Sequence, residues 1–170
     1  MDTMTWPENT PGFVLDVFAR KWLWEAGKDY GHGTGHGVGA ALNVHEGPMS
    51  ISARWKNLEV LKAGMVLSNE PGYYEDGNFG IRIENLMEVC PASEEEPAPG
   101  AKNFFKFKKL TMIPIQKSLI KTELMTDVEM DWLDEYHDTV WKNVSPLLEE
   151  GSAAWKWLEK SCTKIDRSSN

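Results

Sequence analysis

The chain has 170 residues, with 18 Lys and Arg against 26 Asp and Glu, so its formal net charge is −8. This length fits one domain or part of a larger one, and the acidic balance argues against nucleic acid as a partner, because phosphate backbones attract basic surfaces. Since no apolar run reaches about 18 residues and no signal peptide begins the chain, the sequence also predicts no association with a membrane.

The first regular element that the sequence predicts is a helix over residues 12–27, after a frayed polar segment over residues 1–11. Apolar residues recur there at helical spacing, and Gly27 stands where a helix would end. The stripe at this spacing is Leu15, Phe18, Ala19, Trp22 and Ala26.

Glycine occupies every odd position from Gly31 to Gly39, and His32 and His36 stand between the glycines. A helix is disfavoured, because each interior glycine costs about 1 kcal/mol relative to alanine. An extended segment places the glycines on one face, open to close approach by another backbone or a ligand, and both histidines on the other. The histidines would lie roughly 13 Å apart, too far to share one metal ion, so a second task such as contact with substrate is expected for one of them. The alternative is a glycine-rich turn region with incidental histidines.

A β-hairpin is predicted next. Residues 64–70 form a short buried strand, residues 79–89 form its partner, and Asp76-Gly77 is the turn between them. Residues 102–109 are then predicted to form an amphipathic strand with a solvated lysine face.

Two glutamates in this hairpin are expected to face each other. Glu70 lies seven residues before Gly77, and Glu84 lies seven residues after it. In a regular antiparallel hairpin they become near cross-strand partners, with Cβ atoms about 5 Å apart. Like charges so placed repel, unless a cation lies between them or one is protonated. With histidines nearby, a shared metal ion is favoured over a solvated pair that has Arg82 as counter-ion.

Residues 124–163 are predicted to form a helical tail. Thr126 is a candidate N-cap with Glu129 completing a capping box, and Ser145-Pro146 is expected to begin the next helix. Tryptophans also cluster in the tail, and both core packing and a subunit interface account for them. They are Trp132, Trp141, Trp155 and Trp157.

Three motifs in this order carry a family resemblance: HGTGHGVG from His32, NVHEGP from Asn43, and NEPGYYEDGNFGIRIEN from Asn69. They resemble the C-terminal half of the catalytic domain of aminopeptidase P, the Xaa-Pro aminopeptidase, in its eukaryotic cytosolic form. The resemblance covers residues 5–160 and implies an α+β chain. Residues 1–115 would form a partial pita-bread (creatinase/aminopeptidase) fold, the C-terminal half of the peptidase catalytic domain, and residues 116–170 a helical C-terminal extension.

The resemblance further implies two divalent metal ions in the complete enzyme, Mn²⁺ with Zn²⁺ or Co²⁺ as alternatives. By motif position, His36, Glu70 and Glu84 would be metal ligands, with Glu84 bridging the two ions. The substrate would be a peptide with proline in the second position, from which the enzyme releases the N-terminal amino acid.

The resemblance also implies catalytic roles for residues around the metals. His32 and His45 would match the family's substrate-binding and proton-shuttling histidines, and Arg82 an arginine that orients the carboxylates. Glu70 would be the carboxylate that moves the proton.

The family's two aspartate ligands come from strands upstream of the histidine motif. Asp2, Asp16 and Asp29 do not stand in that motif, and Asp16 falls on a helix face. The expectation is therefore a fragment with three of five ligands, weak metal binding and little or no activity. The alternatives are a non-catalytic pita-bread module that binds peptides or partners, and a structural domain with a buried polar network.

Two further expectations concern partners and location. In the family the C-terminal region contributes to dimer formation, so the parent enzyme is expected to be a homodimer. Cys90 and Cys162 are far apart and in no CxxC pattern, which is typical of reduced thiols in a cytoplasmic protein.

Overall fold

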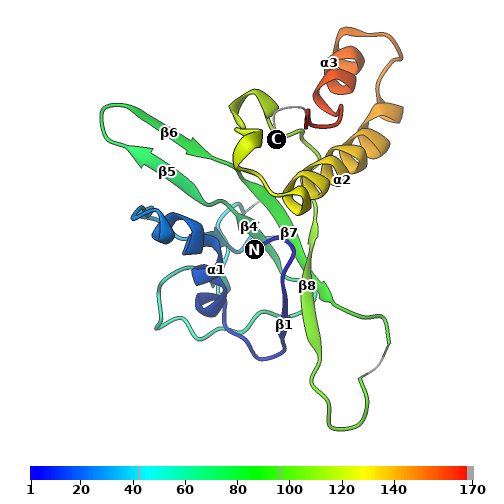
Figure 1. Cartoon of the computed structure of the whole chain (residues 1–170). Helices are drawn as coiled ribbons and strands as arrows, with labels where there is room; N and C mark the ends of the chain where they lie inside the picture. The colour runs from blue at the N-terminus through cyan, green and yellow to red at the C-terminus, as the bar shows by residue number, and fades with distance from the viewer. Residues whose placement is uncertain (42, 96, 168–170) are drawn as a thin grey trace. The chain divides into compact units, whose positions relative to one another are not determined.

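The computed structural model describes residues 1–41, 43–95 and 97–167, and the chain divides into two compact units, Met1–Thr111 and Met112–Asn170. Figure 1 shows the elements of both units in chain order. The predicted boundary after residue 115 falls four residues further along the chain than this division after residue 111. We describe the two units separately.

Unit 1, residues 1–111, contains a four-stranded antiparallel sheet in the order β1-β8-β7-β4 (Figure 1). The strands are β1 (Thr5–Pro7), β4 (Val66–Asn69), β7 (Asn85–Pro91) and β8 (Phe104–Lys109). The prediction of a frayed N-terminal segment is wrong, because β1 pairs with β8 and Trp6 is buried. The Trp6 ring lies 4.4 Å from that of Phe107, so the apolar side of the predicted lysine-faced strand holds the N-terminus in the core.

Two short ladders complete the β structure of unit 1. β2 (Gly35–His36) pairs with β3 (Ser50–Ile51), and β5 (Gly72–Glu75) pairs with β6 (Phe79–Arg82). The strand predicted over residues 79–89 is therefore two strands, β6 and β7, which residues 83–84 separate.

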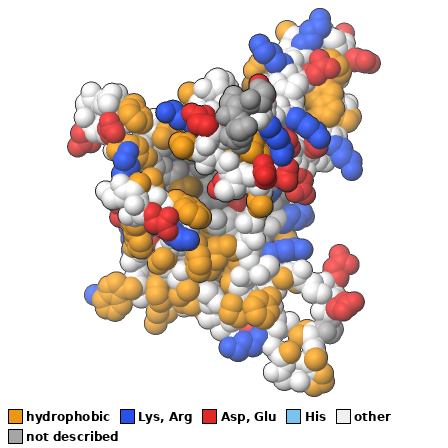
Figure 2. All heavy atoms as spheres, in the orientation of Figure 1, with side chains coloured by type: hydrophobic (Ala, Val, Ile, Leu, Met, Phe, Trp, Pro, Cys, Tyr) orange, Lys and Arg blue, Asp and Glu red, His pale blue; other side chains and the backbone are white. Residues whose placement is uncertain are grey.

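Helix α1 (Gly12–Glu25) confirms the predicted helix, and Gly27 follows it with a φ of +68°. The stripe at helical spacing does not form its buried face, however: Phe18 and Trp22 are 48% and 65% exposed. The residues that α1 buries are Gly12, Leu15, Asp16 and Arg20. Periodicity of apolar residues failed here because the inner face of α1 carries an ion pair. Figure 2 shows hydrophobic side chains gathered on the surface of unit 1 that faces the viewer.

Unit 2, residues 112–170, is helical. It contains three short 3-10 helices, η1 (Lys117–Leu119), η2 (Thr122–Leu124) and η3 (Ser145–Leu147), and two α-helices, α2 (Asp127–Val144) and α3 (Ala153–Ser161). The predicted capping box at Thr126 and Glu129 is confirmed. The predicted start of the last helix at Ser145-Pro146 is wrong. Those residues form η3, and Ser152 caps α3 by accepting from the Trp155 amide.

Three of the four tail tryptophans pack within unit 2. The Trp141 and Trp155 rings lie 5.2 Å apart, and Trp132 stacks on Tyr136 at 6.0 Å. Only Trp157 among the four is largely exposed, at 57%. Core packing therefore accounts for most of this cluster. Within the described ranges, the structure contains no helix that combines the length and the apolar character of a membrane span.

Acid is expected to destabilise unit 2 through His137, which is fully buried. Its Nε2 accepts a hydrogen bond from the Ile115 amide at 3.1 Å, and burial, with Lys117 nearby, lowers the pKa of His137 below its usual 6.5. The unfolded chain thus binds this proton more readily. The stabilisation is complete above pH 6.5 and decreases as the pH falls, by about 1.4 kcal/mol per unit of lowered pKa.

Urea unfolding followed by tryptophan fluorescence, between about pH 7.5 and about pH 5.5, measures this loss. His137→Gln should flatten the dependence of the unfolding free energy on pH, whereas Thr139→Ser, at an exposed and non-ionisable position of the same helix, should leave it unchanged. An equal slope in the His137 variant would contradict the assignment.

Candidate active site

The register of two ladders sets the positions of the two glutamates. The β4–β7 ladder ends at the pair Asn69↔Asn85, and the β5–β6 ladder begins at Gly72↔Arg82. Both ladders have the same register, so Glu70 and Glu84 fall opposite each other in the gap between them. The count from the Asp76-Gly77 turn predicted this arrangement.

His36 reaches the same place from a different part of the chain. Residues 34–38 run antiparallel to β4, where the Glu70 amide donates to the Thr34 carbonyl at 2.8 Å and the Val38 amide to the Val66 carbonyl at 2.9 Å. The predicted close approach at the glycine face is confirmed at Gly35, because a Cβ there would lie 2.0 Å from the carbonyl oxygen of Ser68. The extended prediction fails for residues 31–33, which are bends or irregular.

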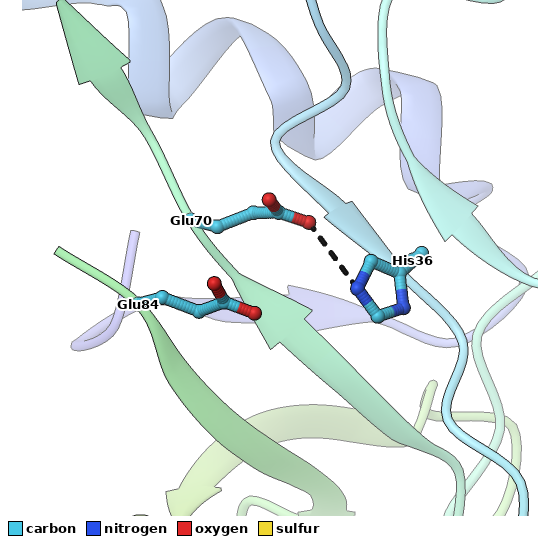
Figure 3. A group of neighbouring side chains, drawn as sticks. All are labelled: His36, Glu70 and Glu84. Atoms are coloured by element: carbon cyan, nitrogen blue, oxygen red, sulfur yellow. Dashed lines mark ion pairs between the residues drawn. The ribbon is translucent and has the colours of Figure 1, made fainter. Parts of the chain in front are cut away.

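His36, Glu70 and Glu84 converge (Figure 3), and one possible ligand atom from each lies within 4.8 Å of the others. The His36 Nε2 lies 3.4 Å from the Glu70 Oε1. The His36 Nδ1 donates to the Gly37 carbonyl at 3.0 Å, so the Nε2 is the ring nitrogen that faces the Glu70 carboxylate. A separation of 3.4 Å suits two ligands of one tetrahedral ion with bonds of about 2.1 Å. Glu70 is buried and Glu84 is exposed.

Glu70 is held by neighbours on both sides. The Ser68 hydroxyl donates to its Oε1 at 2.9 Å and itself accepts from the His36 amide at 2.9 Å. On the other side, the Arg82 Nη1 lies 3.1 Å from the Glu70 Oε2. The expected counter-ion Arg82 is thus present, and it engages one oxygen while the other faces His36.

His32 contacts Arg82 and a residue that sequence reasoning missed, Tyr74. The His32 Nδ1 donates to the Gly33 carbonyl at 2.8 Å, and its Nε2 lies 2.8 Å from the Tyr74 hydroxyl and 3.2 Å from the Arg82 Nη2. The Arg82 Nε donates to the same hydroxyl at 2.9 Å, which raises the pKa of Arg82. The sequence signal for Tyr74 was its position in the predicted hairpin. Tyr74 pairs with Gly80, and side chains two residues apart on a strand share a face, so Tyr74 and Arg82 lie on one face of the hairpin.

His45 lies beside His36, with ring centroids 4.2 Å apart and planes inclined by 50°. It is exposed, on a loop that the Gly39 amide closes by donating to the Asn43 carbonyl at 2.8 Å. His32 and His36 contact different groups, as their predicted spacing required. The structure therefore gathers all the predicted site residues around Glu70: His32, His36, His45, Arg82 and Glu84.

Asp16 and Asp29 do not join this group. Both bind Arg20, with Nε–Oδ2 and Nη1–Oδ1 distances of 2.7 Å. Among the residues that the structure describes, His36, Glu70 and Glu84 are the group of histidine, cysteine and acidic side chains with metal-binding geometry. An imidazole beside two facing carboxylates is a donor set that divalent metal ions bind, so the class of site that this geometry suggests is a metal centre.

Comparison with known proteins agrees. The profile of metallopeptidase family M24 matches residues 2–91, and that of the C-terminal region of peptidase_M24 matches residues 103–165. The chain belongs to metallopeptidase family M24. It is 58% identical to aminopeptidase P2 of Arabidopsis thaliana over 158 residues, which cover 93% of this chain and 22% of that protein. It is 49% identical to a probable Xaa-Pro aminopeptidase P of Coprinopsis cinerea, over 97% of this chain and 26% of that one.

Among solved structures, the chain is similar to the X-prolyl aminopeptidase of Caenorhabditis elegans, described as a cytosolic enzyme with a di-nuclear active site. The TM-score is 0.85 at 40% identity, over 97% of this chain and 26% of that one. The predicted α+β, partial pita-bread fold is thereby confirmed. The chain spans about a quarter of the length of these relatives.

Gly35→Ala is expected to disrupt the site. Its Cβ would lie 2.0 Å from the Ser68 carbonyl oxygen, so the His36 segment and β4 must separate, at a cost of about 1–3 kcal/mol or more in unfolding free energy. Gly31→Ala is the matched control, because nothing lies within 4 Å of a Cβ at that position. Thermal unfolding of both variants measures the difference, and equal melting temperatures would contradict the close approach.

Proposed function

We propose that this chain supplies one half of the active site of an Xaa-Pro aminopeptidase, which releases the N-terminal amino acid from peptides with proline in the second position. The observation that carries the proposal is the convergence of His36, Glu70 and Glu84 from three segments of a family M24 fold. The named relatives are Xaa-Pro aminopeptidases, which supports this substrate class.

In this proposal His36, Glu70 and Glu84 hold divalent metal. The donor set fits, because the His36 Nε2 lies beside two carboxylates that would repel each other without a cation between them. When bound, such a metal lowers the pKa of water and polarises a carbonyl group. Two ions are proposed for the complete enzyme, as in the di-nuclear site of the C. elegans relative, and Mn²⁺ is the proposed identity, with Zn²⁺ or Co²⁺ as alternatives.

The chain's own residues then bind peptide and move protons. Glu70 is proposed to accept and return the proton, held in place by Ser68 and Arg82. His32 is proposed to contact the peptide next to the scissile bond, with Tyr74 orienting its Nε2. His45, exposed beside His36, is proposed to shuttle protons and stabilise the developing oxyanion.

A homodimer formed through the C-terminal region and a cytoplasmic location are proposed for the parent enzyme. The exposed Trp157 ring is available for an interface, and the C. elegans relative is described as cytosolic. Light scattering of the purified chain tests self-association directly.

We expect the purified chain to bind one divalent ion rather than two, because only three ligand side chains cluster among its described residues. Glu84→Gln and His36→Ala should each weaken Mn²⁺ binding by at least about tenfold. Glu88→Gln, a glutamate of β7 that pairs with Lys108, is the control and should bind like the unmodified chain. Calorimetric titration with Mn²⁺ measures this. Undiminished binding by both site variants would overturn the ligand assignment.

We expect that the isolated chain with Mn²⁺ does not hydrolyse an Arg-Pro-Pro peptide at an ordinary enzymatic rate. The reason is that only three possible ligand side chains cluster among its described residues. Substituted for the equivalent quarter of the Arabidopsis aminopeptidase P2, however, it should support hydrolysis. In that chimera Glu70→Gln should lower kcat by about 100-fold or more, and Glu88→Gln should not. A folded chimera that hydrolyses Arg-Ala-Ala with the same kcat/KM as Arg-Pro-Pro would contradict the proline specificity.

A further inference from the structure

The inner face of α1 buries an ion pair that the proposed reaction does not use. Asp16 and Arg20 are 1% and 4% exposed, and the Arg20 Nε donates to the Asp16 Oδ2 at 2.7 Å. Taking two charges out of water is costly, and an apolar pair of similar volume would fill this space without that cost. The pair must therefore supply something besides packing.

The guanidinium group of Arg20 also donates hydrogen bonds to the segment that leads to His32. Its Nη1 donates to the Asp29 carboxylate and to the Tyr30 carbonyl, both at 2.7 Å. Its Nη2 donates to the His32 carbonyl at 2.7 Å and to the Asp16 Oδ1 at 3.3 Å. All five N–H groups of the fork are thus occupied, and burial of the charge is offset by Asp16 and Asp29, which raise the pKa of Arg20.

Asp16 fixes the same segment at a second point. The Thr34 hydroxyl, fully buried, donates to the Asp16 Oδ1 at 2.6 Å and accepts from the Tyr30 hydroxyl at 2.5 Å. The Tyr30 ring also lies under the Arg20 guanidinium, 3.9 Å from its central carbon. The chain is therefore held on both sides of His32, at residues 30 and 34.

His32 needs this support because Gly31 and Gly33 flank it outside any helix or strand. Glycine backbones have wide conformational freedom, so nothing local fixes the direction of the His32 side chain. Its ring is nevertheless held in one orientation, with the Nδ1 on the Gly33 carbonyl and the Nε2 on the Tyr74 hydroxyl.

We propose that Arg20 is a positioning residue, which with Asp16 clamps the backbone around His32 and so sets the His32 imidazole against Tyr74. The relevance of this clamp to peptide binding rests on the proposed function. The clamp gives α1 a role separate from that of the proposed metal ligands. The hydrogen bonds of Arg20 and Asp16 go to the segment around His32 and to each other, and none of these bonds goes to His36, Glu70 or Glu84.

The test is the tautomer of His32, read from the ¹⁵N chemical shifts of the histidine rings in the full 170-residue chain. In the unmodified protein His32 should be held as the Nδ1–H form, because its Nδ1 faces a carbonyl acceptor. In Arg20→Lys, a single ammonium cannot replace the five-donor fork, and the ring should become a mixture of tautomers. Lys21→Gln, on the exposed side of the same helix, should match the unmodified chain.

A merely structural role would disturb the site generally, so the ring signals of His36 are the internal reference. A change at His32 with His36 unchanged supports the clamp, and an unchanged His32 tautomer in folded Arg20→Lys overturns it. Should Arg20→Lys fail to fold, Thr34→Val leaves Arg20 in place and removes the hydroxyl that bonds Asp16 and Tyr30. Partial tautomer mixing at His32 in that variant supports the proposal, and none overturns it.

Failure of the clamp and failure of the proposed function remain distinguishable. Addition of Mn²⁺ should broaden the His36 signals in the unmodified chain, whatever the state of Arg20. If His36 does not respond to Mn²⁺ while His32 responds to Arg20→Lys, the metal assignment fails and the clamp stands. If His36 responds to Mn²⁺ and His32 does not respond to Arg20→Lys, the clamp fails and the metal assignment stands.

Discussion

Two carboxylates face each other across an antiparallel hairpin, and the other residues of the site lie around them. Glu70 and Glu84 lie in a gap between two ladders of one shared register, where neither strand continues its pairing. Like charges in this position are unfavourable unless a positive group lies nearby. The Arg82 guanidinium lies beside one oxygen of Glu70, and the His36 Nε2 lies 3.4 Å from the other. A divalent ion is the group that would use all three side chains together.

The backbone that brings His36 to the carboxylates depends on the absence of side chains. At Gly35 the chain approaches the Ser68 carbonyl more closely than any Cβ would permit. The Ser68 hydroxyl then joins the His36 amide to the Glu70 carboxylate, so one residue aligns the two proposed metal ligands. Gly35 therefore acts indirectly: it allows the close approach of the two backbones that places His36 beside Glu70.

A second layer holds the residues proposed to contact peptide. Tyr74 links His32 to Arg82, and Arg82 in turn contacts Glu70, so His32 and Glu70 belong to one chain of polar contacts. Beneath it, the buried Asp16 and Arg20 fix the backbone on which His32 stands. In α1 a polar pair thus shares the buried face with Leu15, while Phe18 and Trp22 of the apolar stripe lie on the exposed side.

The sequence by itself determined the features that depend on local spacing. The position of Glu70 opposite Glu84 follows from their equal distance from one turn, and the capping box at Thr126 follows from residues three apart. These are short-range consequences of backbone geometry.

Only the tertiary structure decided which side chains meet across long sequence distances. Trp6 is buried because β8, about a hundred residues later, offers its apolar face, and Tyr74 joins the site because His32 is brought beside the hairpin. Arg20 faces inward because its bonding partners, Asp29 and the carbonyls of Tyr30 and His32, lie in a loop that folds back along α1. Hydrogen-bond partners of a buried charge are set by the fold, so no periodicity in the sequence reveals them.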